Sequence, residues 1–296
     1  MSFVLMKQLY ILTRKNLLIL SSLLLFSCGD KNHSIKMKGS DTEVNLAVNL
    51  AEKYTAVDAD FSIAISGGGS GIGITSLLNG QADIANSSRP LSDKEIQQFE
   101  DKKIKVRTVI FAEDATAFVV HKDLPIDVID LETLAKIMKG EITNWNQLGL
   151  VDLPINIYGR QSSSGTHSFI KKKLKIEFSN AAKEMTGNAQ ILEGIKTDKS
   201  GIGYVGAGYI SHESATNPTV KILSIKETPT STAYSPIDAH AINNSLYFFQ
   251  RPLYQFILED SWEKVKPFID FENSTMGKEL IKEHGYYIIE RPQNEI

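Results

Sequence analysis

The sequence predicts an α/β protein, because short apolar strands alternate with amphipathic helices from Ile35 onward. This alternation is typical of a largely parallel sheet. A chain of 296 residues can bury a substantial core and is long enough for two domains of moderate size. With 42% hydrophobic residues and a formal net charge of -3, it has no basic excess that would hold DNA. We therefore expect no nucleic-acid partner.

The amino terminus reads as a signal peptide over residues 1–27. Basic residues precede an apolar stretch over 17–26, which is too short to cross a bilayer. The stretch ends at Cys28, the only cysteine, and LFSC resembles the bacterial lipobox in which the cysteine is acylated. We expect a lipid at Cys28, a tether over 28–33 and a membrane-anchored protein outside the cytoplasm, on the periplasmic or outer face of the cell membrane. Plain secretion with an incidental cysteine is the alternative.

The elements then follow in order along the chain. Strands are expected at 61–66, 106–111, 117–121, 155–158 and 203–205. Apolar residues recur at helical spacing over 44–51, 131–138 and 265–269, and again at 280–281. The polar stretch 211–244 contains three prolines and reads as an irregular connection with one strand at 220–225.

Three predicted helices begin alike, with glycine and hydroxyl residues. A helix start presents unpaired backbone N–H groups and the positive end of the helix dipole, which favour an anion. Ordinary capping is the alternative for each loop taken alone. Ser40 and Glu43 also have the spacing of a capping box. In KGSDTEVNLA, SGGGSGIGITSLL and GRQSSSGTHSF the residues concerned are Ser40, Asp41, Thr42, Ser70, Gly71, Ser164, Gly165 and Thr166.

Two arginines lie near these loops. Arg160 precedes Ser164, and Arg89 follows two serines in ANSSRPL, ahead of a second capping box at Ser92 and Glu95. A guanidinium can bind two oxygens of a tetrahedral oxyanion at once, which lysine cannot do. A surface ion pair is the alternative for either arginine.

Other site classes lack their motifs. The GGGSGIG segment contains no G-x-G-x-x-G and no following lysine in a G-x-x-x-x-G-K-[ST] frame. There is no G-x-S-x-G around Ser70 or Ser164 and no H-E-x-x-H in the chain. The six histidines are scattered without metal-ligand spacing, so we expect neither metal nor cofactor. His167 is expected to be a solvated residue of the first helical turn.

Several segments in order carry a family resemblance: GSDT, ISGGGSGIGITSLLNGQADIANSSRPL, IMKGEITNWNQLG, YGRQSSSGTHSF, SGIGYVGAGYI and KPFIDFENSTMGKELIKEHGYYII. Together they resemble the phosphate-binding lipoproteins (PstS family) of the bacterial ABC phosphate uptake system. The resemblance implies a two-lobed type II periplasmic-binding-protein fold with the ligand cleft between the lobes. Laid on the sequence, it gives residues 34–117 and 243–296 to lobe 1 and residues 118–242 to lobe 2.

The resemblance also implies the site and the partners. The protein would be a non-enzymatic, monomeric substrate-binding protein that delivers inorganic phosphate to the membrane subunits of an ABC permease. Its phosphate ligands, carried over by motif, would be Ser40, Asp41, Thr42, Ser70, Gly71, Ser88, Arg89, Arg160, Ser164, Gly165 and Thr166.

Two positions depart from the family pattern. Some members carry an aspartate at the position of Ser88, which accepts the proton of hydrogen phosphate. Asp41 is our candidate for that role here, since an acceptor separates phosphate from sulfate. Asn244 and Ser245 stand where we expect the arginine-proline pair that relatives carry before the second chain crossing.

Three other functions stay open from the sequence. The fold could bind sulfate, molybdate or tungstate in place of phosphate. The chain could be a secreted serine hydrolase using Ser164 or Ser70, although it lacks a nucleophile elbow and a recognisable base. The anion site could also serve sensing or adhesion without transport.

Overall fold

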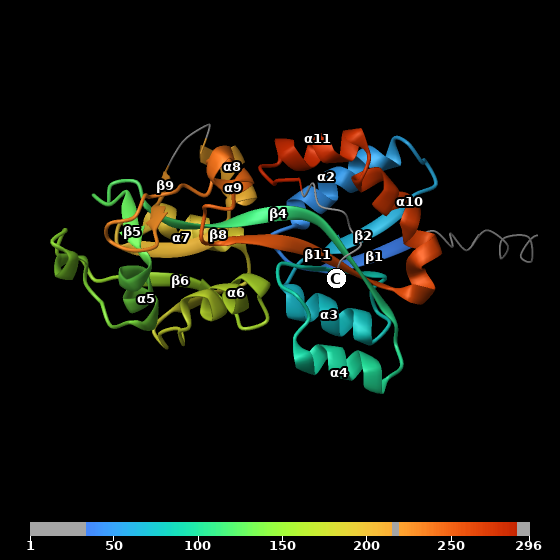
Figure 1. The fold of residues 1–296 in the computed structure, drawn as a ribbon, viewed down its shortest axis with the longest axis horizontal. Helices are drawn as coiled ribbons and strands as arrows, with labels where there is room; N and C mark the ends of the chain where they lie inside the picture. Colours follow the sequence, from blue (N-terminus) through green and yellow to red (C-terminus); the bar gives the residue numbers. More distant parts are fainter. Residues whose placement is uncertain (1–33, 215–218, 289–296) are drawn as a thin grey trace, which may run out of the picture. The chain divides into compact units, whose positions relative to one another are not determined.

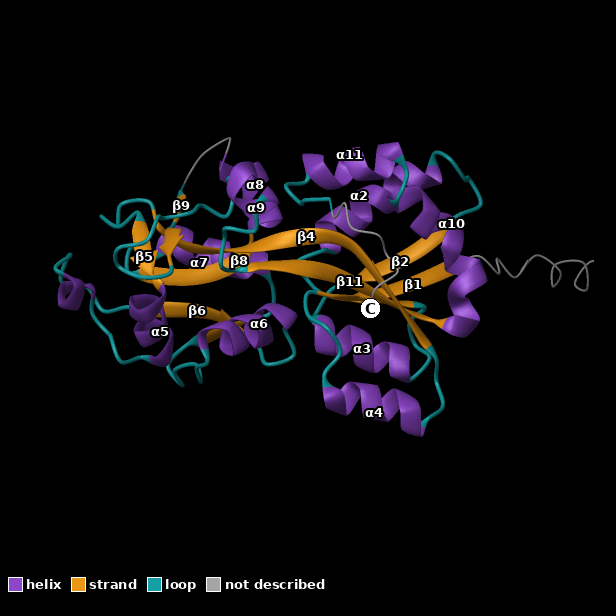
Figure 2. Ribbon diagram, in the orientation of Figure 1, coloured by secondary structure: helices purple, strands orange, loops and turns teal. Residues whose placement is uncertain are grey.

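Strands run through the middle of the computed structural model and helices lie on both sides of them (Figures 1 and 2). The structure describes residues 34–214 and 219–288, with the side chains of 211–214 left out. The predicted signal peptide, Cys28 and the tether lie outside these ranges. Within the described part of the chain, no helix is long and apolar enough to cross a membrane.

One group of elements comes from both ends of the chain. Its strands are flanked by α2, α10 and α11 on one face and by α3 and α4 on the other (Figure 1). The elements are β1 (Ser34–Gly39), α2 (Val44–Thr55), β2 (Ser62–Ser66), α3 (Ser70–Leu78), β3 (Ile84–Ser87), α4 (Asp93–Asp101), β11 (Gln250–Leu258), η2 (Glu259–Ser261), α10 (Trp262–Glu272) and α11 (Thr275–Glu283).

The second group comes from the middle of the chain. Its elements are β5 (Val128–Asp130), α5 (Leu131–Lys139), η1 (Trp145–Leu148), β6 (Asn156–Arg160), α6 (Gly165–Leu174), β7 (Lys183–Met185), α7 (Asn188–Thr197), β8 (Gly201–Gly206), α8 (Ala207–Ser214), β9 (Val220–Ile222), β10 (Ser224–Lys226) and α9 (Ala239–Asn243). The stretch predicted as an irregular connection thus contains α8, two short strands and α9.

A long strand, β4 (Val106–His121), joins the two groups. The prediction of two separate strands at 106–111 and 117–121 is wrong, because the polar residues between them also belong to β4. Asp114 and Thr116 are fully buried there, and Arg251 on β11 pairs with Asp114. A paired charge inside a strand interrupts the apolar pattern without interrupting the strand.

The main sheet is mixed and not largely parallel. Its order is β2-β1-β3-β11-β4-β8-β6-β7, with β9 also on β4, while β5 and β10 pair separately. β1 with β3 and β6 with β7 and β8 are parallel. β11 and β4 run antiparallel to each other and to their outer neighbours β3 and β8. Two antiparallel strands therefore connect two parallel halves.

Separate hydrophobic clusters lie on either side of this connection. The largest contains buried residues between 115 and 249 and includes Trp145, Phe118 and Tyr204. A second contains residues between 35 and 112 and between 253 and 286, and a third packs under α3. We call the two regions lobe 1 and lobe 2; the residue numbers at which each begins and ends stay a prediction.

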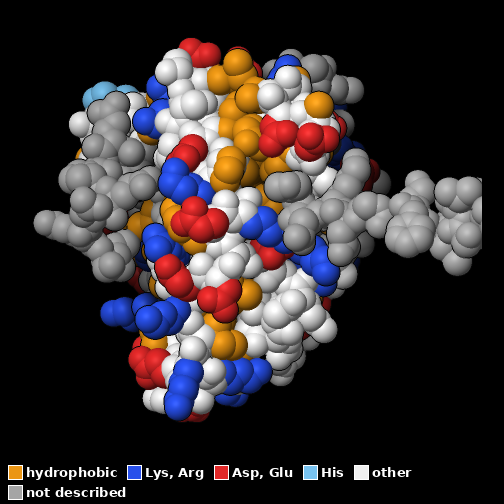
Figure 3. All heavy atoms as spheres, turned by 90° about the vertical axis from the view of Figure 1, so that its right-hand side faces the viewer, with side chains coloured by type: hydrophobic (Ala, Val, Ile, Leu, Met, Phe, Trp, Pro, Cys, Tyr) orange, Lys and Arg blue, Asp and Glu red, His pale blue; other side chains and the backbone are white. Residues whose placement is uncertain are grey.

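One face of lobe 1 carries charges of both signs. Figure 3 shows Lys, Arg, Asp and Glu side chains interspersed on this face, with a band of hydrophobic side chains between them. Neither sign dominates there, which fits the small net charge of the chain.

Lobe 1 also buries a carboxyl group that should make its stability depend on pH. Glu272 on α10 is buried, and burial raises its pKa to about 8, although Gln255 donates a hydrogen bond of 3.0 Å to it. An unfolded glutamate has a pKa near ~4.3. The folded state therefore holds a proton that the unfolded state loses, and stability falls as the pH rises from ~4.3 to about 8.

We expect Glu272→Gln, which imitates the neutral acid, to flatten this dependence. The free energy of unfolding should match that of the wild type below about pH 4 and exceed it by several kcal/mol, about 5 at most, near pH 9. Urea titrations across this range measure the difference. Glu263→Gln on the same helix is the control, because Glu263 is exposed. Parallel pH profiles for Glu272→Gln and the wild type would contradict the prediction.

Candidate anion-binding site

Three hydroxyl groups of lobe 1 meet where its strands end. Ser40 follows β1, Ser88 follows β3 and Ser70 opens α3. Ser40 Oγ lies 3.2 Å from Ser88 Oγ, which is 3.5 Å from Ser70 Oγ, and all three residues are buried. Because β1 and β3 are parallel neighbours, their carboxyl ends share one edge, the usual place of a ligand in such sheets.

Lobe 2 contributes the start of α6. Ser164 is its N-cap, and its Oγ accepts a hydrogen bond of 3.4 Å from the backbone N–H of His167. Gly165 and Thr166 form the first turn and are buried, and Arg160 ends β6 just before this loop. The helix start and the guanidinium are thus brought together by one short loop.

The two helix starts face each other across the lobes. The backbone N–H of Gly71 donates to Ser163 O at 2.9 Å. A Cβ atom placed on Gly165 would lie 2.3 Å from Ser70 Oγ and 2.6 Å from Ser88 Oγ. The hydroxyl cluster of lobe 1 and the first turn of α6 therefore share one site, and glycine permits the close approach.

Arg160 supplies a buried positive charge to this site. Its guanidinium donates through Nη2 to Thr186 O at 2.9 Å, and Nη1 lies 3.5 Å from Asp41 Oδ2 and 3.4 Å from Asn188 Oδ1. Arg160 is 2% exposed. Burial lowers the pKa of its guanidinium, and the carboxylate of Asp41 partly offsets this effect. Since the contacts of Nη1 are long and Nε has no partner among the described residues, the guanidinium keeps donor capacity for an anion.

Asp41 joins the two lobes. Its Oδ2 accepts a hydrogen bond of 2.7 Å from the backbone N–H of Asn188 at the start of α7, in addition to the contact with Arg160. Asn188 was not predicted as a site residue, because the sequence offers no motif at that position.

Arg89 has a different environment. Its Nη1 and Nη2 donate to the two carboxylate oxygens of Glu95 at 2.7 and 2.8 Å. The ion pair weighed as the alternative from the sequence is therefore present, and the capping box of Ser92 and Glu95 is confirmed. A direct role of Arg89 in anion binding stays a prediction.

A second buried arginine, Arg251, was not predicted as a site residue. Arg251 on β11 is 2% exposed and lies 3.1 Å through Nη2 from Thr166 Oγ1. Arg251 is followed by Pro252, so β11 contains an arginine-proline pair, whereas Asn244 ends α9.

The capping box predicted at Ser40 and Glu43 is wrong. Glu43 is the N-cap of α2 and makes no side-chain capping bond, while Ser40 Oγ points to Ser88. The carboxyl group of Glu43 is buried and its oxygens have no hydrogen-bond partner in the described part of the chain. Burial raises the pKa of Glu43 well above its ordinary value. The hydroxyl of Ser40 therefore belongs to the hydroxyl cluster of lobe 1 and does not cap α2.

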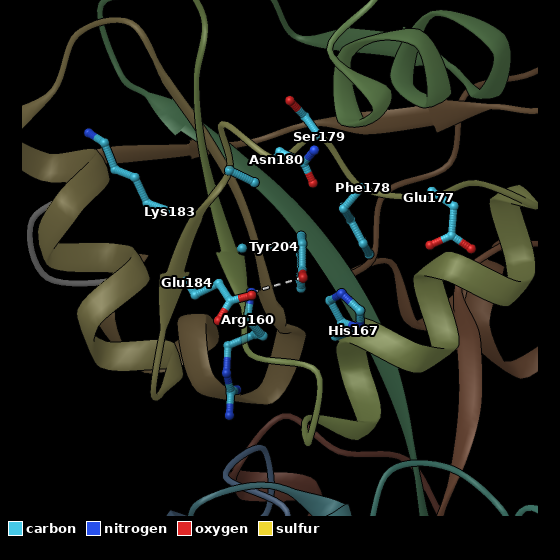
Figure 4. Close-up of a pocket in the computed structure, with 11 residues that line it drawn as sticks. Arg160, His167, Glu177, Phe178, Ser179, Asn180, Lys183, Glu184 and Tyr204 are labelled. Atoms are coloured by element: carbon cyan, nitrogen blue, oxygen red, sulfur yellow. Dashed lines mark hydrogen bonds between the residues drawn. The ribbon is translucent and has the colours of Figure 1, made fainter.

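A pocket of about 210 Å³ lies behind Arg160 in lobe 2. Figure 4 shows the hydroxyl of Tyr204, which accepts the backbone N–H of Arg160 at 2.9 Å, while the guanidinium points away from His167 and Phe178. The ring of His167 lies 4.6 Å from that of Phe178, and burial lowers the pKa of His167. His167 lies in the first turn of α6 as predicted, but it is half-buried and not fully solvated, because its ring packs against Phe178.

No group of His, Cys, Asp and Glu side chains in the described ranges could hold a metal ion. The donors assembled here are hydroxyl, backbone N–H and guanidinium groups, which suit an anion.

Comparison with known proteins identifies the family. A model described as the PBP superfamily domain matches residues 29–271. The phosphate-binding protein PstS of Borreliella burgdorferi is 30% identical over 295 residues, which cover 95% of this chain and 98% of that protein. The chain belongs to the PstS family. This assignment confirms the resemblance deduced from the sequence motifs.

Solved structures agree with the PstS assignment. An ABC-type phosphate transport receptor from Vibrio cholerae is 28% identical, with a TM-score of 0.66, and the match covers 86% of this chain and all of the other. A candidate phosphate ABC transporter substrate-binding protein from Clostridium perfringens, solved with bound phosphate, has a TM-score of 0.76 at 24% identity and covers 87% of this chain and 100% of its own. The second match concerns the fold alone. The predicted two-lobed α/β fold is confirmed.

Proposed function

We propose that this PstS-family protein binds inorganic phosphate outside the cytoplasm and delivers it to an ABC permease. The observation that supports this most directly is the meeting of two helix starts and a buried guanidinium. Gly165 approaches Ser70 and Ser88 so closely that a Cβ would clash, and Arg160 lies beside the same loop. Such a site offers many donors and a positive charge in a buried position.

The proposed phosphate ligands are those predicted from the sequence, but the structure supports some of them more strongly than others. Ser40, Ser70, Ser88, Ser164, Gly165 and Thr166 are buried, as phosphate donors in a closed cleft should be. Thr42 and Arg160 are also buried, whereas Arg89 already binds Glu95. Lobe closure around the anion would be the state that the permease recognises, because the ligand gains extra contacts only there.

Asp41 is the proposed acceptor for the proton of hydrogen phosphate. Its Oδ2 already accepts from Asn188 and lies near Arg160, which leaves Oδ1 as the candidate atom. A carboxylate facing fully deprotonated sulfate would be repelled and would lack a donor, so this contact would favour phosphate.

A serine hydrolase is poorly supported by this geometry. Ser164 Oγ accepts the N–H of His167 as a helix cap, and the ring of His167 packs against Phe178. The imidazole is therefore not placed as a base for Ser164. The relatives named above are binding proteins, which favours a non-enzymatic role.

The direct test is isothermal titration with phosphate. Bound anion carried through purification must first be removed by partial unfolding and refolding. We expect saturable binding of phosphate with a Kd in the micromolar range or tighter (about -8 kcal/mol or below). Competition with sulfate, molybdate and tungstate should leave phosphate bound. If one of those anions bound tightly and phosphate did not bind, that anion and not phosphate would be the ligand.

We further propose that a lipid on Cys28 anchors a monomeric protein to the membrane. The support is the lipobox-like LFSC segment after an apolar stretch. Fractionation of cells that express a Cys28→Ser variant would test it, since an unanchored protein leaves the membrane fraction.

A further inference from the structure

We propose that Arg251 is a positioning residue, which orients the hydroxyl groups of Thr42 and Thr166 so that they donate hydrogen bonds to the bound anion. Thr42 belongs to lobe 1 and Thr166 to lobe 2, and Arg251 lies on β11, one of the two central antiparallel strands. This inference rests on the proposed phosphate function and adds a residue that the sequence motifs did not supply.

Arg251 is held in place by a buried ion pair. It stands opposite Asp114 in the antiparallel pairing of β11 and β4. Its Nε and Nη2 donate to Asp114 Oδ2 at 3.1 and 2.8 Å, and the two side chains are 2% and 0% exposed. The ring of Phe169 on α6 lies 5.1 Å from its Cζ. A guanidinium fixed by an ion pair and by packing can orient its neighbours.

The same guanidinium reaches one hydroxyl on each lobe. Nη2 lies 3.1 Å from Thr166 Oγ1 and 3.4 Å from Thr42 Oγ1. The two hydroxyl oxygens are 3.3 Å apart. All three residues are buried. Arg251 on β11 therefore contacts one hydroxyl group from each lobe at the site.

The direction of these bonds follows from the chemistry of the groups. A guanidinium can only donate, whereas a hydroxyl has one hydrogen and two lone pairs. Nη2 carries two hydrogens and donates one to Asp114, so the two threonine oxygens share the other as acceptors. Only one of the two hydroxyl hydrogens can be used between Thr42 and Thr166, so at least one remains for a third partner. A deprotonated oxyanion oxygen is such an acceptor, and the charged donor behind the hydroxyl strengthens the bond.

The experiment is a mutant cycle read by phosphate titration. Arg251→Gln should weaken phosphate binding about tenfold or more, as should Thr42→Val combined with Thr166→Val. If Arg251 acts through these hydroxyls, the triple variant should lose no more affinity than the larger of the two separate losses. Arg107→Gln is the matched control, because Arg107 on β4 forms an exposed ion pair with Glu259. Its affinity should equal that of the wild type.

A second variant covers the case in which Arg251→Gln leaves Asp114 as an unpaired buried charge and fails to fold. Arg251→Gln with Asp114→Asn removes both charges and should keep the fold, checked by circular dichroism. It should show the same loss, and Arg251→Lys should restore part of the affinity. Additive losses in the cycle, or wild-type affinity without Arg251, would overturn the inference. Failure of the wild type to bind phosphate would instead overturn the proposed function.

Discussion

Replacing Arg160 with alanine should weaken phosphate binding by about 100- to 1000-fold, which corresponds to ~3 to 4 kcal/mol. Arg160 is 2% exposed and ends β6, just before the loop that brings α6 to the hydroxyls of lobe 1. Without it, a doubly charged anion would be buried without a counter-charge, and Asp41 would add its own negative charge nearby. Isothermal titration of wild type and variant measures the difference.

Arg107→Ala serves as the control for loss of an arginine, since the Arg107 pair with Glu259 is exposed. Both variants should melt within a few degrees of the wild type in the absence of phosphate. Equal phosphate affinity for the Arg160 variant and the wild type would remove Arg160 from the site.

Gly165→Ala should also impair binding, by about 10- to 100-fold, because a methyl group here meets groups of the opposite lobe. The added Cβ would lie 2.3 Å from Ser70 Oγ and 2.6 Å from Ser88 Oγ. Either the lobes stay apart or the two hydroxyls turn away from the anion. Phosphate titration measures the loss, and small-angle scattering with saturating phosphate shows whether closure still occurs.

The control for Gly165→Ala is Ser162→Ala in the same loop. Ser162 is exposed, and the sequence left it without a role. Its removal should change neither affinity nor closure. If Gly165→Ala bound phosphate as tightly as the wild type, the close approach of the lobes at this point would not belong to the bound state.

The parts of the site that the sequence predicted are those that local patterns determine. Ser164 caps α6 as its spacing to the apolar face implies, and Arg160 lies in the same short segment. The capping box at Ser92 and Glu95 follows the same local rule. Their positions depend on residues only a few places away, so one sequence suffices to predict them.

The parts that were missed depend on partners far away in the chain. Asp114 interrupts the apolar pattern of its strand, and only its partner Arg251 on β11 explains why the strand continues. Asn188 donates to Asp41 from the other lobe. Ser40 has the spacing of a cap, but its hydroxyl is taken by Ser88 across the sheet. Strand direction in the centre of the sheet was missed for the same reason, because β11 returns from the far end of the chain.

Direct bonds between the lobes bear on the free protein as well. The backbone of Gly71 donates to Ser163 O, and Gln161 Nε2 donates to Gly68 O at 3.0 Å. Neither bond involves the anion. Both bonds therefore lower the free energy of the state in which the lobes are in contact, even when no anion is bound. Part of the population is then pre-assembled before phosphate arrives, and the apparent Kd depends on that fraction. Changing Gln161 would shift affinity through this equilibrium without touching the phosphate.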